Sequence, residues 1–240
     1  MRVLDLFSGI GGLSLGLHWA GMRTVGFCES DAWCRGVLGR HWPGVPVYDD
    51  VRRLSGTRLR ADGVAWPELV CGGFPCQDVS AAGRGAGLEG GRSGLWREME
   101  RLVGELGPDW VVVENVPSLR VRGADRVCAG LEALGYACWP LVVGAAHAGA
   151  PHRRGRVWVV AYAGGAGLEG WERGAAGAAA GLPVAGPGGW AAAPGVRRVA
   201  DGVSGGVDRR ARVRALGNAV VPQVAEMVGR AVLHAAGTRL

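Results

Sequence analysis

The sequence predicts an α/β protein built on a doubly wound, mostly parallel sheet, with a small irregular insert in its C-terminal half. Three observations support this class. Short apolar runs alternate with helix-like stretches as far as residue 162. The run from Trp110 to Glu114 is apolar until its last residue, which is typical of a strand buried on both faces. The chain has 240 residues, 48% of them hydrophobic, which is enough for one large domain with a full core.

The elements follow one another in a regular order. We expect strands over residues 2–7, 24–29, 45–48, 69–71, 110–114, 136–144 and 156–162. We expect helices from the first glycine turn to residue 20 and over 31–41, 123–135 and 222–236. Asp31 suits a helix start, and Pro222 is acceptable in a first turn.

The composition changes at Ala163. From there the chain is mostly Gly, Ala and Pro, with no clear period, so this stretch cannot bury much surface. We therefore divide the chain into a main domain, residues 1–162 plus 199–240, and a reduced insert, residues 163–198.

The net charge of +6 and the pI near 9.4 suit a polyanionic partner such as DNA. All 27 basic residues are arginine, however, and Ile, Asn and Gln are rare, which also fits a GC-rich coding sequence. Arginine content alone is therefore weak support for nucleic-acid binding. The rare residues persist in the motifs described below: Ile10, Gln77, Asn115, Asn218 and Gln223.

Other compositional features exclude whole classes of protein. The six cysteines form no Cys-x-x-Cys pair and do not cluster with histidines, so we expect neither a metal site nor a disulfide framework. No apolar run approaches the ~20 residues of a membrane span. The N-terminus starts directly on a strand-like run, so we expect no signal peptide and a cytoplasmic protein. We also expect a monomer.

A cysteine stands on a glycine-proline corner, Gly72 to Gln77, just after a short apolar strand. A thiolate at Cys76 can act as a nucleophile there, because nothing on the corner crowds it. The alternative is an inert, buried free cysteine. The glycine-rich stretch 80–93 that follows is expected to be a lid that closes over substrate.

Asp5 to Gly12 reads as a strand, a glycine turn and a helix start, where the backbone can approach a ligand closely. The alternative is merely a tight turn, and the spacing differs from that of a dinucleotide fingerprint. Glu29 ends the second strand, where a carboxylate can accept two ribose hydroxyls. Asp50 ends the third, where it can accept from an adenine amine. Both could instead be solvated acids at strand ends.

Glu114 ends the buried strand 110–114. A carboxyl beside an apolar wall tends to have a raised pKa and can then hold or share a proton. The alternative is a capping acid. Further along, Arg154 and Arg156 alternate, so both are expected on one face of a strand start.

In this order the motifs resemble those of the DNA cytosine-5 methyltransferases, in particular the short bacterial and phage-type members. The resemblance covers about residues 1–162 and 199–236 and includes the last segment, Gly217 to Pro222. His152 stands where the family has glutamine. Over 163–198, where the family has its target-recognition domain, the resemblance fails. The fold it implies is the Rossmann-like fold of S-adenosylmethionine-dependent methyltransferases.

The resemblance also implies a set of site residues. The catalytic residues would be Cys76, Glu114, Arg154 and Arg156. The residues that bind S-adenosylmethionine would be Asp5, Phe7, Gly9, Gly11, Gly12, Glu29, Asp50, Pro75, Asn218 and Val220. Phe7 would pack against the adenine, and no metal would be needed.

The activity implied by the resemblance is methyl transfer to carbon 5 of a cytosine flipped out of double-stranded DNA. Cys76 would add to C6 while Glu114 neutralises the charge that builds at N3. Two alternatives stay open: a tRNA cytosine-5 methyltransferase, and a nucleic-acid-binding remnant without turnover. A role in restriction-modification or in phage protection stays open too.

Overall fold

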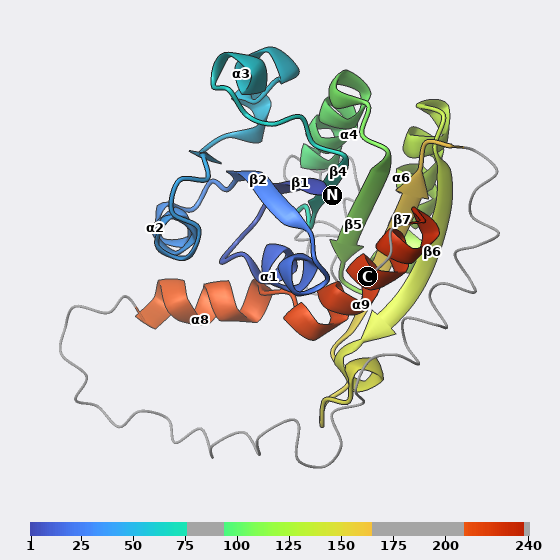
Figure 1. Ribbon diagram of the computed structural model, residues 1–240. Coiled ribbons are helices and arrows are strands. Elements are labelled where there is room, and N and C mark those ends of the chain that lie inside the picture. The colour runs from blue at the N-terminus through green and yellow to red at the C-terminus, as the bar shows by residue number, and fades with distance from the viewer. Residues whose placement is uncertain (76–93, 165–208, 238–240) are drawn as a thin grey trace.

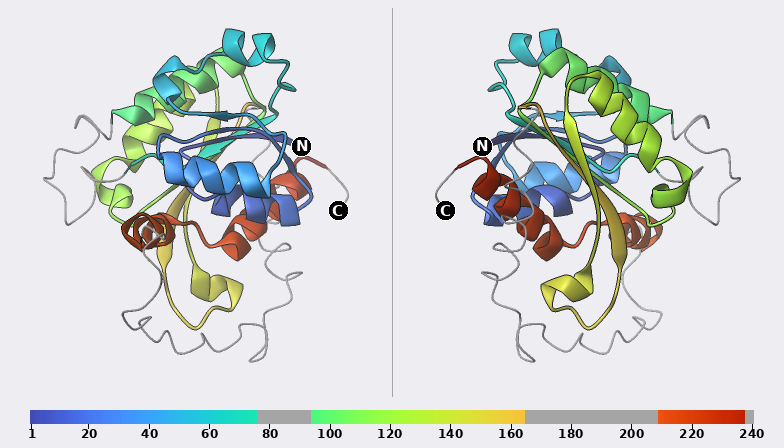
Figure 2. Two further views of the ribbon diagram at one scale, coloured as in Figure 1. Left: turned by 90° about the vertical axis from the view of Figure 1, so that its left-hand side faces the viewer. Right: turned by 90° about the vertical axis from the view of Figure 1, so that its right-hand side faces the viewer.

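The computed structural model describes residues 1–75, 94–164 and 209–237, with the backbone alone for 209–213. Within these ranges a seven-stranded sheet carries helices on both faces (Figures 1 and 2). The strand order is β3-β2-β1-β4-β5-β7-β6. The strands are β1 (Arg2–Leu6), β2 (Arg23–Cys28), β3 (Val47–Tyr48), β4 (Leu69–Gly72), β5 (Trp110–Asn115), β6 (Ala137–Gly144) and β7 (Gly155–Tyr162).

The helices include all four that the sequence predicts. They are α1 (Gly12–Trp19), α2 (Ala32–His41), α3 (Gly56–Ala61), α4 (Leu95–Leu106), α5 (Leu119–Arg122), α6 (Ala124–Ala133), α8 (Arg209–Asn218) and α9 (Pro222–Ala235), with 3-10 turns at Val51–Arg53 and Ala145–Ala148. Asp31 caps α2 through bonds from the Trp33 and Cys34 amides. Pro222 occupies the first turn of α9, as expected.

The sheet is parallel from β3 through β5 and antiparallel at β7 and β6. The chain runs outward from β1 to β3 and then returns to β4 on the other side of β1. This places a topological switch point between β1 and β4, and ligands bind at the carboxyl ends of strands at such a point. The predicted mostly parallel, doubly wound α/β class is confirmed.

Two apolar layers hold the sheet between its helices. On one face, α4 and α6 pack against β4, β5 and β7, and on the other, α1 and α9 pack against β1, β5 and β7. Gly16 lets α1 and α9 approach closely, because a Cβ there would lie 2.1 Å from the Pro222 carbonyl oxygen. Strand β5 is buried at all six positions, as its apolar sequence predicts.

Helix α4 and the backbone of α8 are the main elements that the sequence prediction missed. The buried residues of α4 are Trp96, Met99, Leu102, Val103 and Leu106. They recur at helical spacing, so the pattern was available in the sequence.

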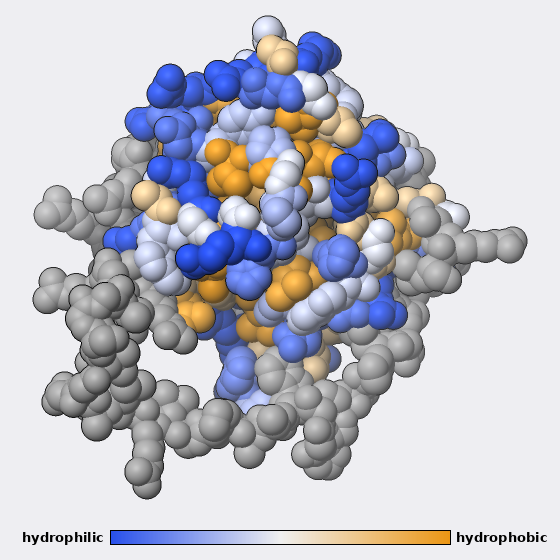
Figure 3. Space-filling model, turned by 60° about the vertical axis from the view of Figure 1, so that its left-hand side comes forward, coloured by the Kyte–Doolittle hydropathy of each residue, from blue (hydrophilic) through white to orange (hydrophobic). Residues whose placement is uncertain are grey.

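Three of the segments discussed in the sequence analysis lie outside the described residues. They include the loop 80–93 and the insert 163–198, except for the first two residues of the insert. Residues 199–208 of the main domain also lie outside. Among the described residues no helix is long and apolar enough to cross a membrane. On the face shown in Figure 3, apolar patches lie between hydrophilic side chains.

Candidate active site

The glycine turn after β1 has free space beside Gly9, whereas Gly11 packs against the Trp42 ring. Gly9 has φ 54°, and a Cβ added there would meet no heavy atom within 4 Å. Gly11 has φ 84°, and a Cβ there would lie 2.5 Å from the Trp42 ring. Phe7 also has a positive φ, 56°, which is unusual for an aromatic residue and marks a constrained turn. The open side at Gly9 leaves room for a ligand against the backbone.

Glu29 joins this turn to the start of α2. One carboxylate oxygen accepts the Gly9 amide at 2.8 Å, and the other accepts the Asp31 amide at 2.7 Å. Each carboxylate oxygen has a further lone pair, so Glu29 can still accept two hydroxyl groups. An open glycine backbone beside such an acid fits the ribose of a nucleoside-type cofactor.

Asp50 follows β3 and caps the 3-10 turn behind it. Its carboxylate accepts the Arg52 amide at 3.0 Å and the Arg52 Nε at 2.9 Å. The hydrogen bonds from Arg52 lower the pKa of Asp50, so this carboxylate is ionised and can act only as an acceptor. That character is compatible with the predicted contact to the amine of an adenine.

Asp5 lies beneath α1, with only 1% of its surface exposed. It accepts the Ser14 hydroxyl at 2.7 Å, and Ser14 in turn accepts the Thr24 hydroxyl at 3.0 Å. Burial raises the pKa of Asp5 to about 7, although its bonds with Ser14 and Cys71 act in the opposite direction. The structure therefore places this predicted cofactor residue where it supports the turn from below.

The glycine-proline corner begins where β4 ends. Asn115, at the end of β5, donates from its side-chain amide to the Phe74 carbonyl at 3.0 Å. The side-chain oxygen of Asn115, Oδ1, accepts the Val116 amide at 2.9 Å. Pro75 is the last described residue of the corner, and the predicted nucleophile Cys76 lies outside the described residues.

Asn115 is thus a site residue that the predicted set lacked. It fixes the backbone two residues before Cys76. The sequence held a signal for it, because Asn115 is one of only two asparagines in the chain.

Glu114 is 8% exposed and forms an ion pair with Arg156, whose Nε lies 3.0 Å from its Oε1. Burial raises the pKa of Glu114 to about 7, while the charges of Arg156 and Arg154 act to lower it. A Cβ added at Gly73 would lie 3.0 Å from the Glu114 Oε2, so the corner and this carboxyl are neighbours. Near neutral pH the carboxyl can therefore carry a proton beside the corner that leads to Cys76.

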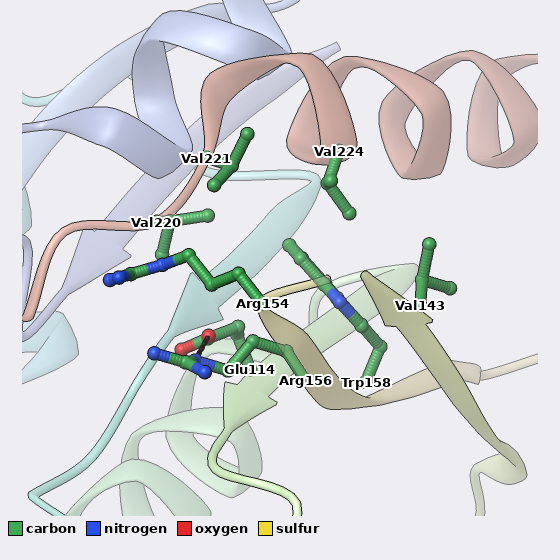
Figure 4. A pocket seen from close by; sticks show the side chains of 8 residues that line it. All are labelled: Glu114, Val143, Arg154, Arg156, Trp158, Val220, Val221 and Val224. Carbon is green, nitrogen blue, oxygen red and sulfur yellow. Dashed lines mark ion pairs between the residues drawn. The ribbon is translucent and has the colours of Figure 1, made fainter. Parts of the chain in front are cut away.

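A pocket opens beside Glu114, between the ends of β5, β6 and β7 and the first turn of α9 (Figure 4). Its polar wall consists of Glu114, Arg154 and Arg156. Its apolar wall consists of Val143, Trp158, Val220, Val221 and Val224. Polar and apolar side chains thus meet beside Glu114, where β5, β6 and β7 approach α9.

Arg154 lies just before β7, with φ 29°. Its Nη2 donates to the Gly217 carbonyl at 2.8 Å and to the Ala219 carbonyl at 2.7 Å. The residue between these carbonyls, Asn218, is exposed, and Val220 lines the pocket. A Cβ at Gly12 would lie 2.6 Å from the Val220 carbonyl oxygen, so the last motif returns to the glycine turn.

The structure thus gathers the predicted residues into two groups. One lies around the glycine turn and Glu29, and the other around Glu114 and the two arginines, with the segment 217–220 between them. In the part of the chain that the structure describes, no group of three or more His, Cys, Asp or Glu side chains could hold a metal ion.

Comparison with known proteins gives a consistent result. Residues 1–174 match the family described as C-5 cytosine-specific DNA methylase. The chain is 38% identical over 169 residues to the type II methyltransferase M2.BsuMI of Bacillus subtilis, covering 67% of this chain and 42% of that protein. It is 32% identical over 163 residues to the type II methyltransferase M.NgoFVII of Neisseria gonorrhoeae, covering 66% and 43% of the two chains.

A solved structure is also similar. It is an E. coli prophage protein assigned as a DNA modification methyltransferase, with a TM-score of 0.58 and 27% identity. The match covers 68% of this chain and 46% of that one. This likeness confirms the prediction of a Rossmann-like fold of S-adenosylmethionine-dependent methyltransferases. The chain spans less than half the length of these relatives.

Proposed function

This chain belongs to the family of C-5 cytosine-specific DNA methylases, and on that premise we propose that it transfers a methyl group from S-adenosylmethionine to carbon 5 of cytosine in double-stranded DNA. The observation that carries the proposal is the buried Glu114, paired with Arg156 and adjacent to Gly73 of the corner that leads to Cys76. The similar proteins named type II methyltransferases support the same reaction class.

The glycine turn and the strand ends beside it suit the cofactor. The backbone at Gly9 and Gly11 would lie against it, Glu29 would accept the ribose hydroxyls, and Asp50 would accept from the adenine amine. The remaining contacts proposed from the sequence are Phe7, Gly12, Pro75, Asn218 and Val220. Asp5, also proposed from the sequence, is buried beneath α1 and would act by supporting the turn. When bound, S-adenosylmethionine supplies a methyl group that is electrophilic because it sits on a positively charged sulfur.

The residues around the pocket would activate the base. Carbon 5 of cytosine is a poor nucleophile, so electron density must first be added to the ring. The Cys76 thiolate would form a bond to C6, and the electron pair displaced toward N3 would be neutralised there by the Glu114 proton. Arg156 would hold the Glu114 carboxyl in place for this step, since it pairs with Oε1 and leaves Oε2 on the side of the corner.

Carbon 5 of the resulting enamine would then bond to the methyl carbon as the bond from that carbon to sulfur breaks, with S-adenosylhomocysteine as the leaving group. The ring would be restored by an elimination. The proton at C5 would leave to solvent, the electron pair of the C5–H bond would form the C5–C6 double bond as the Cys76 thiolate departs, and the proton at N3 would return to Glu114. The base must first leave the duplex to reach the pocket, which costs a few kcal/mol of unstacking and unpairing.

The test uses DNA in which the target cytosines carry fluorine at C5. Fluorine cannot leave as a proton, so the bond between Cys76 and C6 should persist after methyl transfer and survive denaturing electrophoresis. The adduct should require S-adenosylmethionine, and Cys76→Ala should lose both the adduct and methylation while still binding cofactor. Cys71→Ala is the matched control, and this variant should still form the adduct at Cys76.

Methylation of C5 by Cys76→Ala, or an adduct mapped to Cys71, would show that Cys76 is not the nucleophile. A parallel assay with tRNA distinguishes the substrates. Methylation of tRNA but not of DNA would replace the proposed substrate with RNA.

A further inference from the structure

The two arginines of the motif at residues 154–156 have different partners, although both line the same pocket. Arg156 pairs with the Glu114 carboxylate, whereas Arg154 donates to two main-chain carbonyls of the C-terminal segment. We infer that Arg154 is a positioning residue for the cofactor: it holds residues 217–220 in the shape that presents Asn218 and Val220 to S-adenosylmethionine. This inference rests on the proposed function.

The first argument is the geometry of the two bonds. One nitrogen of Arg154 reaches Gly217 O at 2.8 Å and Ala219 O at 2.7 Å, so a single group ties together the carbonyls on either side of Asn218. Both lengths lie in the range usual for hydrogen bonds from a charged N–H donor. They set the backbone orientation of Asn218 from both sides.

The second argument is where these carbonyls lie. Helix α8 ends at Asn218 and α9 begins at Pro222, so residues 219–221 join two helices without a strand ladder of their own. The carbonyls at a helix C-terminus have no intrahelical partners, and they carry the negative end of the helix dipole. A cationic side chain there satisfies the free carbonyls and is favoured electrostatically. Arg154 therefore caps α8 from a distant part of the chain.

The third argument is the contact on the other side of the same segment. Gly12, the first residue of α1, lies so close to Val220 that a Cβ would be 2.6 Å from its carbonyl oxygen. Residues 217–220 are thus held between Arg154 and the glycine turn at which the cofactor is proposed to bind. A shift of this segment would move the last wall of the cofactor site.

The fourth argument concerns charge. Glu114 is ion-paired with Arg156 at 3.0 Å, whereas Arg154 directs its hydrogen bonds to neutral carbonyls. Arg154 acts on Glu114 only through its charge, which helps to lower the pKa of that carboxyl. Arg154→Lys keeps this charge while it changes the bonds to Gly217 and Ala219, so this variant separates the two effects.

The experiment compares cofactor binding by the full chain without DNA, with S-adenosylhomocysteine as the calorimetric probe. Arg154→Ala should weaken binding about tenfold or more, the loss expected when hydrogen bonds from a charged group are removed. Arg154→Lys should recover part of the affinity, because an ammonium can donate to both carbonyls. In methylation assays Arg154→Lys should raise the KM for S-adenosylmethionine while the pH profile of kcat stays that of the wild type.

Arg230→Ala is the matched control. Arg230 lies on α9 and pairs with Glu226 at 2.7 Å, so its removal also costs a bond from a guanidinium, but one within α9 and away from residues 217–220. Its affinity for the probe should match the wild type. Should Arg154→Ala not fold, as judged by its thermal transition, Arg154→Gln takes its place with an amide donor and no charge.

The outcomes separate this inference from the proposed function. Wild-type affinity in Arg154→Ala or its substitute, or an equal loss in Arg230→Ala, would overturn the role of Arg154 and leave the proposed function standing. Failure of the wild-type chain to bind the probe would overturn the proposed cofactor, and this inference with it.

Discussion

The cofactor side and the base side of the site are built in different ways. Around the glycine turn the bonds are local: the Gly9 amide meets a Glu29 carboxylate 20 residues away. Around Glu114 the contacts join more distant parts of the chain, such as the bond from Asn115 to the Phe74 carbonyl, 41 residues away. The cofactor side uses backbone groups and an ionised acid, whereas the base side uses a buried acid that can hold a proton. Binding a hydroxylated sugar and activating a ring require these different environments.

The largest expected effect lies on the base side. Glu114→Gln keeps the size of the side chain but removes the acid, so methylation should fall on the order of 10²-fold or more. Cofactor affinity should stay at the wild-type value, because Glu114 lies in the other group of residues. Single-turnover methylation and calorimetry with S-adenosylhomocysteine measure the two effects, and a parallel loss of cofactor binding would erase the proposed division.

The dependence of kcat/KM on pH gives a second test of Glu114 as the acid. The folded-state pKa of Glu114 is about 7, so the protonated form is lost as the pH rises through that value. For the wild type, kcat/KM should decline on that limb. Glu114→Gln should lose this limb, and its retention would assign the titration to another group.

The next effect lies on the cofactor side. Glu29→Ala removes a charged acceptor and should weaken S-adenosylhomocysteine binding by about 1.5–3 kcal/mol. The adduct formed by Cys76 with 5-fluorocytosine DNA should still appear when S-adenosylmethionine is raised to compensate. Glu29→Gln is the matched variant, since it keeps one of the two acceptor oxygens and should lose less. Unchanged calorimetric affinity in Glu29→Ala would remove this residue from the proposed site.

The smallest expected effect is on stability, and it distinguishes the role of Asp5 from that of Glu114. Asp5, like Glu114, has a pKa raised to about 7 by burial, but it faces α1 rather than the pocket. A raised native pKa means that the folded state binds more protons than the unfolded state between about pH 4 and 7. The free energy of unfolding contributed by Asp5 should therefore decrease as the pH rises through that window.

Asp5→Asn should remove this contribution, an effect on the order of 1–3 kcal/mol across the window. The alkaline limb of activity assigned to Glu114 should keep its position. Urea unfolding at pH 4.5 and 7.5 measures the first effect, and kcat/KM profiles measure the second. A shifted limb would mean that Asp5 contributes to the titration seen in catalysis.

The helix that the prediction missed and the strand whose direction it left open show two kinds of limit. Helix α4 has buried residues at helical spacing, so a closer reading of residues 95–106 could have found it. The direction of β7 is different: its apolar sequence is compatible with either orientation. In the structure β7 runs antiparallel between β5 and β6, and this places Trp158 opposite Glu114 and brings Arg156 to the carboxyl.

The sequence by itself determined the local structural features. These are the strand and glycine turn at Asp5–Gly12, the acids Glu29 and Asp50 after two strands, and the buried strand that leads to Glu114. These depend on neighbours within one or two turns of chain, so pattern alone predicts them. The tertiary structure decided which of these side chains meet. It paired Arg156 with Glu114, directed Arg154 to the carbonyls around Asn218, and placed Asp5 under α1. The reason is that burial, strand direction and long-range hydrogen bonds arise only when distant segments pack together, and these set both the pKa values and the partners.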